Sequence, residues 1–112
     1  MRLHGIDCPE VGQPFWRRAK EFTSEMVFGR EVRIHVRDID RYGRTVAEVI
    51  FGEDGRMLNR ELVQAGLAWW YKQYAPYDSR IEELERDARE ASRDLWSDGN
   101  AVAPWDWRRE RR

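Results

Sequence analysis

The sequence is short of cysteine, of long apolar runs and of net charge, and each shortage excludes a class of protein. Cys8 is the only cysteine in 112 residues, which excludes an intrachain disulfide and a metal site built from several thiolates. No segment approaches the roughly 20 apolar residues of a membrane-spanning helix, so no membrane partner is predicted. The formal net charge of -1 creates no global field for a polyanion, so binding of nucleic acid would need a local basic cluster.

The remaining composition is typical of a single folded domain covering residues 1–112. Hydrophobic residues make up 41% of the chain and charged residues 37%, and this balance excludes a disordered tail. A chain of 112 residues can bury one hydrophobic core but not two. The first residues have neither the charged n-region nor the apolar h-region of an export signal, and the sequence predicts no particular localisation.

Short or alternating apolar segments predict strands in the first half of the chain. Residues 2–6 favour a short strand that ends before Pro9. Residues 32–37 alternate apolar with polar or charged side chains, which is typical of a half-buried strand, and residues 46–51 are rich in β-formers. Because residues 40–43 read as a turn, the two segments predict a hairpin.

Helical periodicity predicts three helices. The first lies between Pro14 and Gly29, and the second covers residues 58–65 with Asn59 as its cap. The third begins at residue 79 with a capping box and carries one apolar stripe: Ile81, Leu84, Ala88, Ala91 and Leu95.

The segments on either side of the third helix are rich in aromatic residues. Residues 68–74 read as extended, and their cluster Trp69, Trp70 and Tyr71 is interpreted as core. After residue 96 we expect an irregular tail whose tryptophans pack back on the body. The basic residues at its end are interpreted as a solvated tail: Arg108, Arg109, Arg111 and Arg112.

Four charged residues form the candidate site. Asp7 and Glu10 flank a proline turn at the end of the first strand. Arg2 lies earlier on that strand, and Arg44 follows a Tyr-Gly turn. Carboxylate oxygens suit calcium or magnesium and arginine forks match phosphate oxygens, so the set suggests a site for a cation and a phosphate. On spacing alone, salt-bridged surface loops are the favoured explanation.

A resemblance to a known family changes this balance. The blocks RLHGIDCPE, AKEFTSEMV, DRYGRTVAEVIF, LNRELVQAGLAWWY and DLWSD occur in an order and with a spacing similar to the staphylococcal nuclease (thermonuclease) family. The resemblance covers nearly the whole chain and implies an α+β fold, an OB-type five-stranded barrel with three helices. It also implies a calcium-dependent phosphodiesterase acting on DNA and RNA that leaves 3′-phosphorylated products.

The resemblance implies a role for each candidate residue. Asp7 matches a carboxylate ligand of Ca²⁺, and Cys8 stands where the family supplies a backbone carbonyl to the metal. Glu10 matches the general base or water-orienting residue. Arg2 and Arg44 match the arginines that grip the scissile phosphate and stabilise the charge that develops on it.

The resemblance also implies substrate contacts beside the reacting centre. Arg41 and Tyr42, in the turn before Arg44, match positions on the phosphate side of the substrate. Tyr74 resembles an aromatic residue beside the nucleotide, where stacking would bind single strands with little sequence preference.

The sequence departs from the family at its front. Family members place two strands and a second aspartate ligand before the RLHGIDCPE-like block, whereas here Met1 directly precedes Arg2. We therefore expect a barrel that lacks its first two strands, with weakened calcium binding and activity that is low or absent. Open strand edges would favour a homodimer or a strand-swapped assembly. A fragment of a longer nuclease is the simpler explanation.

The sequence thus predicts a calcium-dependent nuclease, and two alternatives stay open. One is a non-catalytic OB module that binds nucleic acid or protein, for which the missing aspartate argues. The other is a structural assembly domain that uses the open edge. Glu10 together with both arginines argues for the enzyme, because a module that only binds has little need of a base.

Overall fold

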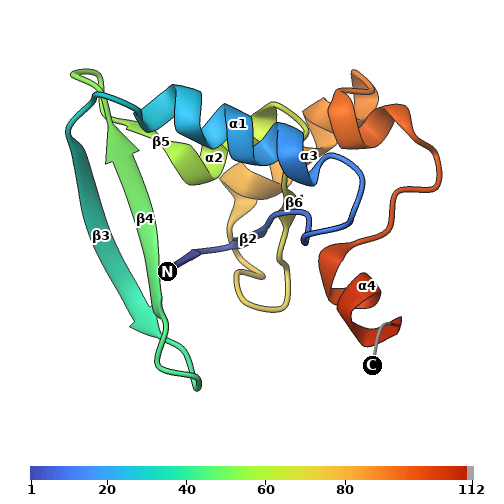
Figure 1. Cartoon of the computed structure of the whole chain (residues 1–112), viewed down its shortest axis with the longest axis horizontal. Helices are drawn as coiled ribbons and strands as arrows, with labels where there is room; N and C mark the ends of the chain where they lie inside the picture. Colours follow the sequence, from blue (N-terminus) through green and yellow to red (C-terminus); the bar gives the residue numbers. More distant parts are fainter. Residues whose placement is uncertain (111–112) are drawn as a thin grey trace.

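The computed structural model describes residues 1–110, in which helices pack around a small, open β-sheet and a separate strand pair (Figure 1). The elements in chain order are β1 (Arg2–Leu3), β2 (Ile6–Asp7), α1 (Trp16–Val27), β3 (Val32–Ile39), β4 (Thr45–Phe51), β5 (Arg56–Met57), α2 (Leu58–Gln64), β6 (Trp69–Trp70), α3 (Ser79–Glu90), the 3-10 helix η1 (Asp94–Ser97) and α4 (Pro104–Glu110). The predicted α+β class is confirmed, and the strands of the described residues form no closed sheet.

The main sheet has the order β1-β4-β3, with β5 also paired to β4. β1 runs parallel to β4, and β3 and β4 form the predicted antiparallel hairpin. The predicted strand over residues 2–6 is divided, because Gly5 adopts a φ of 78° and turns the chain between β1 and β2. β2 then pairs with β6 (Trp69–Trp70). Residues 68–74 were predicted to be extended, and only these two residues of that segment form a strand.

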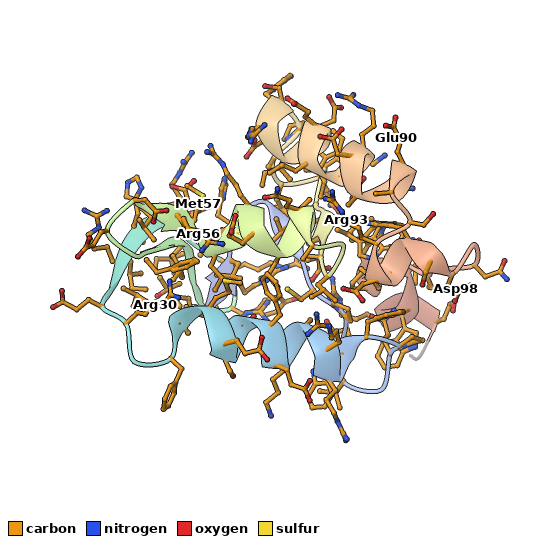
Figure 2. All side chains as sticks on the ribbon, turned by 90° about the horizontal axis from the view of Figure 1, so that it is seen from above. Arg30, Arg56, Met57, Glu90, Arg93 and Asp98 are labelled. Atoms are coloured by element: carbon orange, nitrogen blue, oxygen red, sulfur yellow. The ribbon has the colours of Figure 1, made fainter. Side chains whose placement is uncertain are left out.

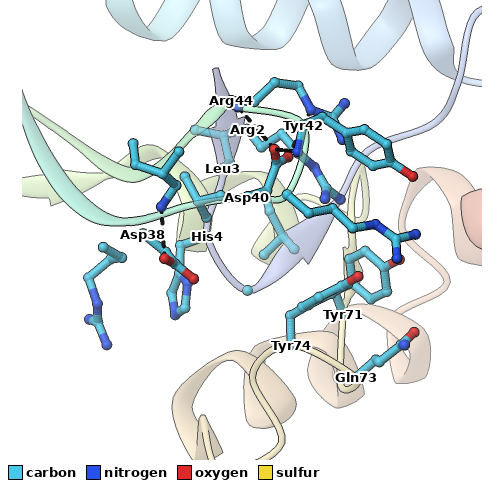
Figure 3. A pocket seen from close by; sticks show the side chains of 16 residues that line it. Arg2, Leu3, His4, Asp38, Asp40, Tyr42, Arg44, Tyr71, Gln73 and Tyr74 are labelled. Carbon is cyan, nitrogen blue, oxygen red and sulfur yellow. Dashed lines mark hydrogen bonds and ion pairs between the residues drawn. The ribbon is translucent and has the colours of Figure 1, made fainter.

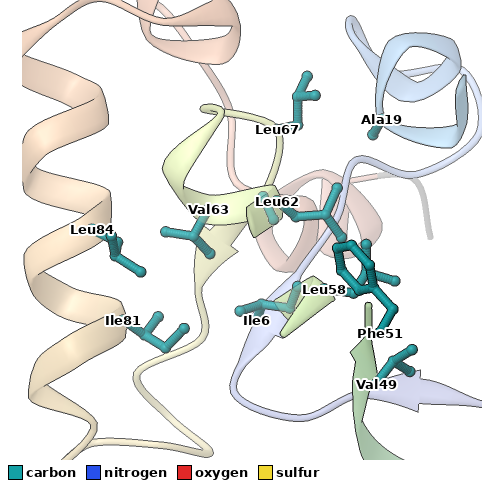
Figure 4. Close-up of a cluster of buried hydrophobic side chains, with 11 residues drawn as sticks. Ile6, Ala19, Val49, Phe51, Leu58, Leu62, Val63, Leu67, Ile81 and Leu84 are labelled. Carbon is teal, nitrogen blue, oxygen red and sulfur yellow. The ribbon is translucent and has the colours of Figure 1, made fainter. Parts of the chain in front are cut away.

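The core lies where α2 packs between α1 and α3 and against β4 (Figure 2). Leu62 and Val63 of α2 are fully buried, and Phe51 of β4 fills the space beside them (Figure 4). Each such side chain contributes about 1.5–3 kcal/mol through burial of its apolar surface. The predicted apolar stripe is confirmed for Ile81, Leu84 and Ala88 of α3, which are buried. It does not continue along one helix to residue 95, because α3 ends at Glu90, Ala91 is exposed and the buried Leu95 belongs to η1.

Asn59 corrects the predicted cap of the second helix. It lies within α2, is only 1% exposed, and caps nothing; Met57 occupies the N-cap position. The Asn59 Oδ1 accepts the Val49 N–H at 3.1 Å, and its Nδ2 donates to the carbonyls of His4 at 2.9 Å and Ala47 at 3.2 Å. One buried amide therefore connects α2, β4 and the end of β1.

Two further predictions about helices were wrong in detail. Asp78, rather than Ser79, caps α3, because its Oδ1 accepts the Ile81 N–H at 3.1 Å. The tail after residue 96 contains α4 where an irregular segment was expected, although Trp105 does pack back on the body as predicted.

β3 is exposed where a half-buried strand was expected. Its apolar side chains Val32, Ile34, Val36 and Ile39 are 40%, 45%, 53% and 56% exposed. The hairpin extends away from the helices, and no element of residues 1–110 covers this face of the strand (Figure 1). The alternation correctly predicted a strand, but periodicity does not say what covers its apolar face.

Candidate active site

Asp7 and Glu10, here called the acid pair, lie at and just beyond the end of β2. Asp7 is buried and is held by the pairing of β2 with β6. Glu10 lies in the following loop, where its N–H donates to the Oε1 of Gln13 at 2.9 Å. Gln13 is itself buried, and its Nε2 donates to the carbonyl of Val102 at 2.9 Å. This loop is therefore tied to the segment that leads into α4.

Arg108 of α4 binds both members of the acid pair. Its Nη2 donates to the Oδ2 of Asp7 at 2.9 Å, and its Nη1 donates to the Oε1 of Glu10 at 2.5 Å. The Nη2 also lies 3.5 Å from the hydroxyl of Tyr71. The interpretation of Arg108 as part of a solvated tail is therefore wrong. Arg109 does project to the surface, where it pairs with Asp106, and Arg111 and Arg112 lie outside the described residues.

Burial and pairing of charges act in opposite directions on the ionisation of Asp7 and of Arg108. Desolvation raises the pKa of Asp7 above its ordinary value, although Arg108 and Arg2 both act to lower it. Desolvation acts to lower the pKa of Arg108, but the hydrogen bonds that it donates to Asp7 and Glu10, together with their charges, outweigh it and raise that pKa. Desolvation, with the charges of the acid pair, raises the pKa of the Cys8 thiol to about 12. The thiol is thus no nucleophile near neutral pH.

Most of the other predicted site residues line one cavity of about 480 Å³, here called the arginine pocket. It lies between β1, the loop joining β3 and β4, and the turn after β6 (Figure 3). The side chains that the sequence nominated and that line it are Arg2, Arg41, Tyr42, Arg44 and Tyr74. Its volume lies within the range of small-ligand sites.

Asp40 organises the loop that carries three of these side chains. Its Oδ1 accepts the N–H groups of Tyr42 and Arg44, both at 2.9 Å, and its Oδ2 accepts the Nε of Arg44 at 2.8 Å. Slight desolvation acts to raise the pKa of Asp40, but these bonds outweigh it and lower the pKa. Arg41 and Arg44 both lie over the Tyr42 ring, at 5.1 Å and 5.3 Å from its centroid.

Tyr71 connects the arginine pocket with the acid pair. The guanidinium of Arg2 lies 5.6 Å from the ring centroid of Tyr71 and 5.8 Å from that of Tyr74. Trp105 of α4 stacks on the Tyr71 ring, with the ring centroids 4.9 Å apart and an interplanar angle of 13°. Tyr71 is buried, as the core interpretation expected, yet it also lines the pocket and approaches Arg108.

The four residues that define the candidate site therefore form two adjoining groups. Asp7 and Glu10 meet at Arg108, whereas Arg2 and Arg44 meet in the arginine pocket, whose lining excludes both acids. Arg2 is the link, because its charge acts on Asp7 and its guanidinium lies at Tyr71. The sequence did not predict a role for Arg108 in the site. Its carboxylate partners lie about 100 residues earlier in the chain, and no local sequence pattern indicates a contact over that separation.

The acid pair suits a hard cation by donor type but not by donor number. Asp7 offers carboxylate oxygens and Cys8 a carbonyl, which are ligands that Ca²⁺ accepts. Among residues 1–110, however, no group of three His, Cys, Asp or Glu side chains could hold a metal ion. Ca²⁺ usually gathers six to eight oxygens, and both carboxylates here already bind a guanidinium.

None of the described helices is both long enough and apolar enough to cross a bilayer.

Comparison with known proteins points to one family. A family model described as staphylococcal nuclease homologue matches residues 1–98. The chain is 40% identical over 117 residues to a micrococcal nuclease of Shigella flexneri, an alignment that covers 97% of this chain and 67% of that protein. It is 39% identical over 108 residues to an uncharacterized endonuclease of Escherichia coli O157:H7, covering 96% of this chain and 69% of that protein.

Plant relatives are much longer than this chain. A probable staphylococcal-like nuclease of Oryza sativa subsp. japonica is 36% identical over 114 residues, which is 100% of this chain and 29% of the rice protein. The chain therefore spans about two thirds of the bacterial relatives described above and less than a third of this plant one.

Proposed function

Because the chain belongs to the staphylococcal nuclease homologue family, we propose that it is an endonuclease of thermonuclease type that hydrolyses phosphodiester bonds in DNA, RNA or both. Its products carry 3′-phosphates in this proposal. The observation that supports it most is the arginine pocket, in which Arg2 and Arg44 face a cavity of nucleotide size beside the acid pair.

The arginine pocket has the chemistry to bind a phosphodiester. Guanidinium forks match phosphate oxygens and stay charged at every physiological pH, so Arg2 and Arg44 bind the phosphate and stabilise the charge that grows on it. Asp40 holds Arg44 through its Nε, which leaves the terminal nitrogens free to turn towards the phosphate. Tyr42 and Tyr74 are more than half exposed at the rim, where bases would stack, and Arg41 adds a further phosphate contact.

Glu10 is the proposed general base. It is the more exposed member of the acid pair, so its carboxylate can reach a water molecule that the buried Asp7 cannot. It accepts the proton of the attacking water, whose oxygen then attacks the phosphorus held by the arginines. The bond from phosphorus to the 5′-oxygen breaks, the phosphate stays on the 3′-end, and the departing 5′-oxygen takes a proton from solvent to become a hydroxyl. Arg108 must move away from Glu10 before that carboxylate is free to accept the proton.

Calcium is the proposed cofactor. Asp7 would hold it through its carboxylate and Cys8 through its backbone carbonyl, with water and substrate oxygens completing the shell. When bound, the cation would polarise a phosphoryl oxygen.

We further propose that the fold is an OB-type barrel without its first two strands. We also propose that the exposed face of β3 packs against a second copy of the chain, in a homodimer or a strand-swapped assembly. The four exposed apolar side chains of β3 support this proposal.

A second candidate is a non-catalytic module that binds nucleic acid through the same pocket. The engagement of both acids by Arg108 favours it, because such a module needs the arginines and tyrosines but no free base.

A plasmid-nicking assay separates the two candidates. We expect wild-type protein to cut plasmid with Ca²⁺ and not with chelator, and Glu10→Gln to lose the cutting while keeping its affinity for a fluorescent oligonucleotide. Glu90→Gln is the matched control, since Glu90 projects into solvent from the end of α3 (Figure 2) and should cut normally. Wild-type protein that binds the oligonucleotide tightly but never cuts would instead establish the module.

A further inference from the structure

A second cavity continues the arginine pocket along the turn after β6. It has a volume of about 420 Å³, is lined by Tyr71, Lys72, Gln73 and Trp105, and is here called the Lys72 cleft. Tyr71 and Gln73 also line the arginine pocket, together with Tyr74 (Figure 3). The two cavities therefore adjoin, and a chain molecule that fills the first can continue into the second.

The aromatic walls of the Lys72 cleft are held in place before any ligand binds. Trp105 stacks on Tyr71 with the ring centroids 4.9 Å apart, and it meets the Trp69 ring edge-on with a centroid distance of 5.6 Å. Pro104, beside it in α4, is fully buried. The Tyr71 N–H donates to the carbonyl of Gly5 at 2.9 Å. Walls that are already ordered can stack on a base at little entropic cost.

Lys72 gives the cleft a positive charge that no ion pair offsets. Its ammonium lies 5.7 Å from the centroid of the Trp70 ring, and no carboxylate of residues 1–110 pairs with it. Glu85 and Asp106, which line a neighbouring cavity with Lys72, each pair with an arginine of their own helix instead. A cation beside aromatic rings is the combination with which proteins bind the phosphates and bases of a single strand.

We propose that the Lys72 cleft is a second nucleotide subsite for a single-stranded nucleic acid. It takes the nucleotide adjacent to the one whose phosphate lies in the arginine pocket. The base stacks on the aromatic walls, and Lys72 contacts the phosphate. Bases in a duplex have their faces covered by neighbouring bases, so this subsite selects unpaired strands. The inference rests on the proposed function only in taking the arginine pocket as a phosphate site.

The affinity of Lys72→Gln for a fluorescent single-stranded oligonucleotide tests the subsite, in the presence of chelator so that no strand is cut. We expect binding at low salt to be weaker by about threefold or more, because one phosphate contact is lost. The slope of log Kd against log salt concentration should fall by about 0.7, the value for one phosphate of a single strand. Wild-type affinity and slope in Lys72→Gln, or no binding by either protein, would overturn the subsite.

Lys20→Gln is the matched control. Lys20 is exposed on α1 and lies 5.3 Å from the centroid of the Trp16 ring, much as Lys72 lies over Trp70, but it lines neither cavity. The variant removes the same charge and should bind the oligonucleotide like wild type. An equal loss of affinity in Lys20→Gln and Lys72→Gln would overturn the subsite, because it would show only an effect of net charge.

A second measurement uses wild-type protein and does not depend on the folding of a variant. An oligonucleotide that carries the photoreactive base 5-iodouracil at successive positions should cross-link to Trp105 or Tyr71 from one position and to Tyr42 or Tyr74 from the adjacent one, as mapped by mass spectrometry. Cross-links confined to Tyr42 and Tyr74 would overturn the subsite. Failure of the proposed function is distinguishable, because it would appear as absent plasmid cutting or as wild-type oligonucleotide affinity in Arg44→Ala.

Discussion

Two aspartates in this molecule show how surroundings, rather than residue type, set the chemistry of a carboxylate. Asp7 is buried, and desolvation raises its pKa even though Arg108 binds it. The Asp40 side chain is 15% exposed, and desolvation acts to raise its pKa, but it accepts two backbone N–H groups and the Nε–H of Arg44, and these bonds together lower that pKa. The first carboxylate is paired with Arg108 in a desolvated place, and the second is a fixed anchor for Arg44.

The pH dependence of Asp40 follows from the sign of its shift. A carboxyl whose pKa is lower in the folded state stabilises the fold above its unfolded pKa, and this contribution is lost as pH falls through the folded value. We expect the Asp40 carboxyl to titrate below 3.8 in a folded-state NMR titration. The loop amides of Tyr42 and Arg44 should shift with the same midpoint, and Asp40→Asn should remove that transition. A midpoint at or above 3.8 would contradict the account of this loop.

Asn59 shows how a single polar side chain can hold several elements together. It makes three hydrogen bonds: those to Val49 and Ala47 of β4 are buried, and the one to His4 after β1 is partly buried. These bonds hold β1 against β4, and β1 carries Arg2 into the arginine pocket. The positioning of Arg2 therefore depends on a residue that touches no substrate.

We expect Asn59→Ala to lower the free energy of unfolding by about 2–4 kcal/mol, since it leaves the Val49 N–H and the His4 carbonyl without this partner, while the Ala47 carbonyl keeps only the His4 N–H. Urea denaturation followed by tryptophan fluorescence measures this loss. Asn100→Ala is the control, because Asn100 lies exposed in a turn and should stay within about 0.5 kcal/mol of wild type. A loss for Asn59→Ala as small as that of the control would mean that the amide is not structural.

The elements that the sequence predicted well are those whose signals are local. The hairpin β3–β4, the helix α1 and the apolar stripe of α3 follow from periodicity and turn residues within short windows. Arg108 could not be predicted in this way, because its partners lie 98 and 101 residues away and nothing local distinguishes it from Arg109. The role of Asn59 is equally hidden from local signals: an Asn near a helix start predicts a cap, whereas its three hydrogen-bond partners belong to other elements.

At the scale of the whole molecule, the most unusual feature is the uncovered face of β3. Four apolar side chains on one face of an edge strand form a surface that soluble monomers rarely expose. The core around Phe51 and α2 covers the neighbouring strand β4, whereas β3 projects beyond it from an otherwise packed body (Figure 1).

We expect light scattering coupled to size-exclusion chromatography to give twice the chain mass of 13.5 kDa for the wild type. Ile34→Lys should shift the protein to a monomer, because it places a charge in the middle of the apolar face. Arg33→Ala, on the neighbouring position of β3, is the control and should remain dimeric. A wild-type protein that is monomeric at all concentrations would contradict the proposed assembly.

The whole account depends on the acid pair and the arginine pocket acting on one phosphate. The most direct measurement is kcat/KM for cleavage of a single-stranded oligonucleotide by wild type, Glu10→Gln, Arg44→Ala and the double variant. We predict that each single change lowers kcat/KM by about 100-fold or more. The loss of kcat/KM in the double variant should be much smaller than the product of the two single losses, because the effects of groups that act as one unit are not additive. Wild-type kcat/KM in Arg44→Ala, or losses that simply multiply, would contradict a shared site.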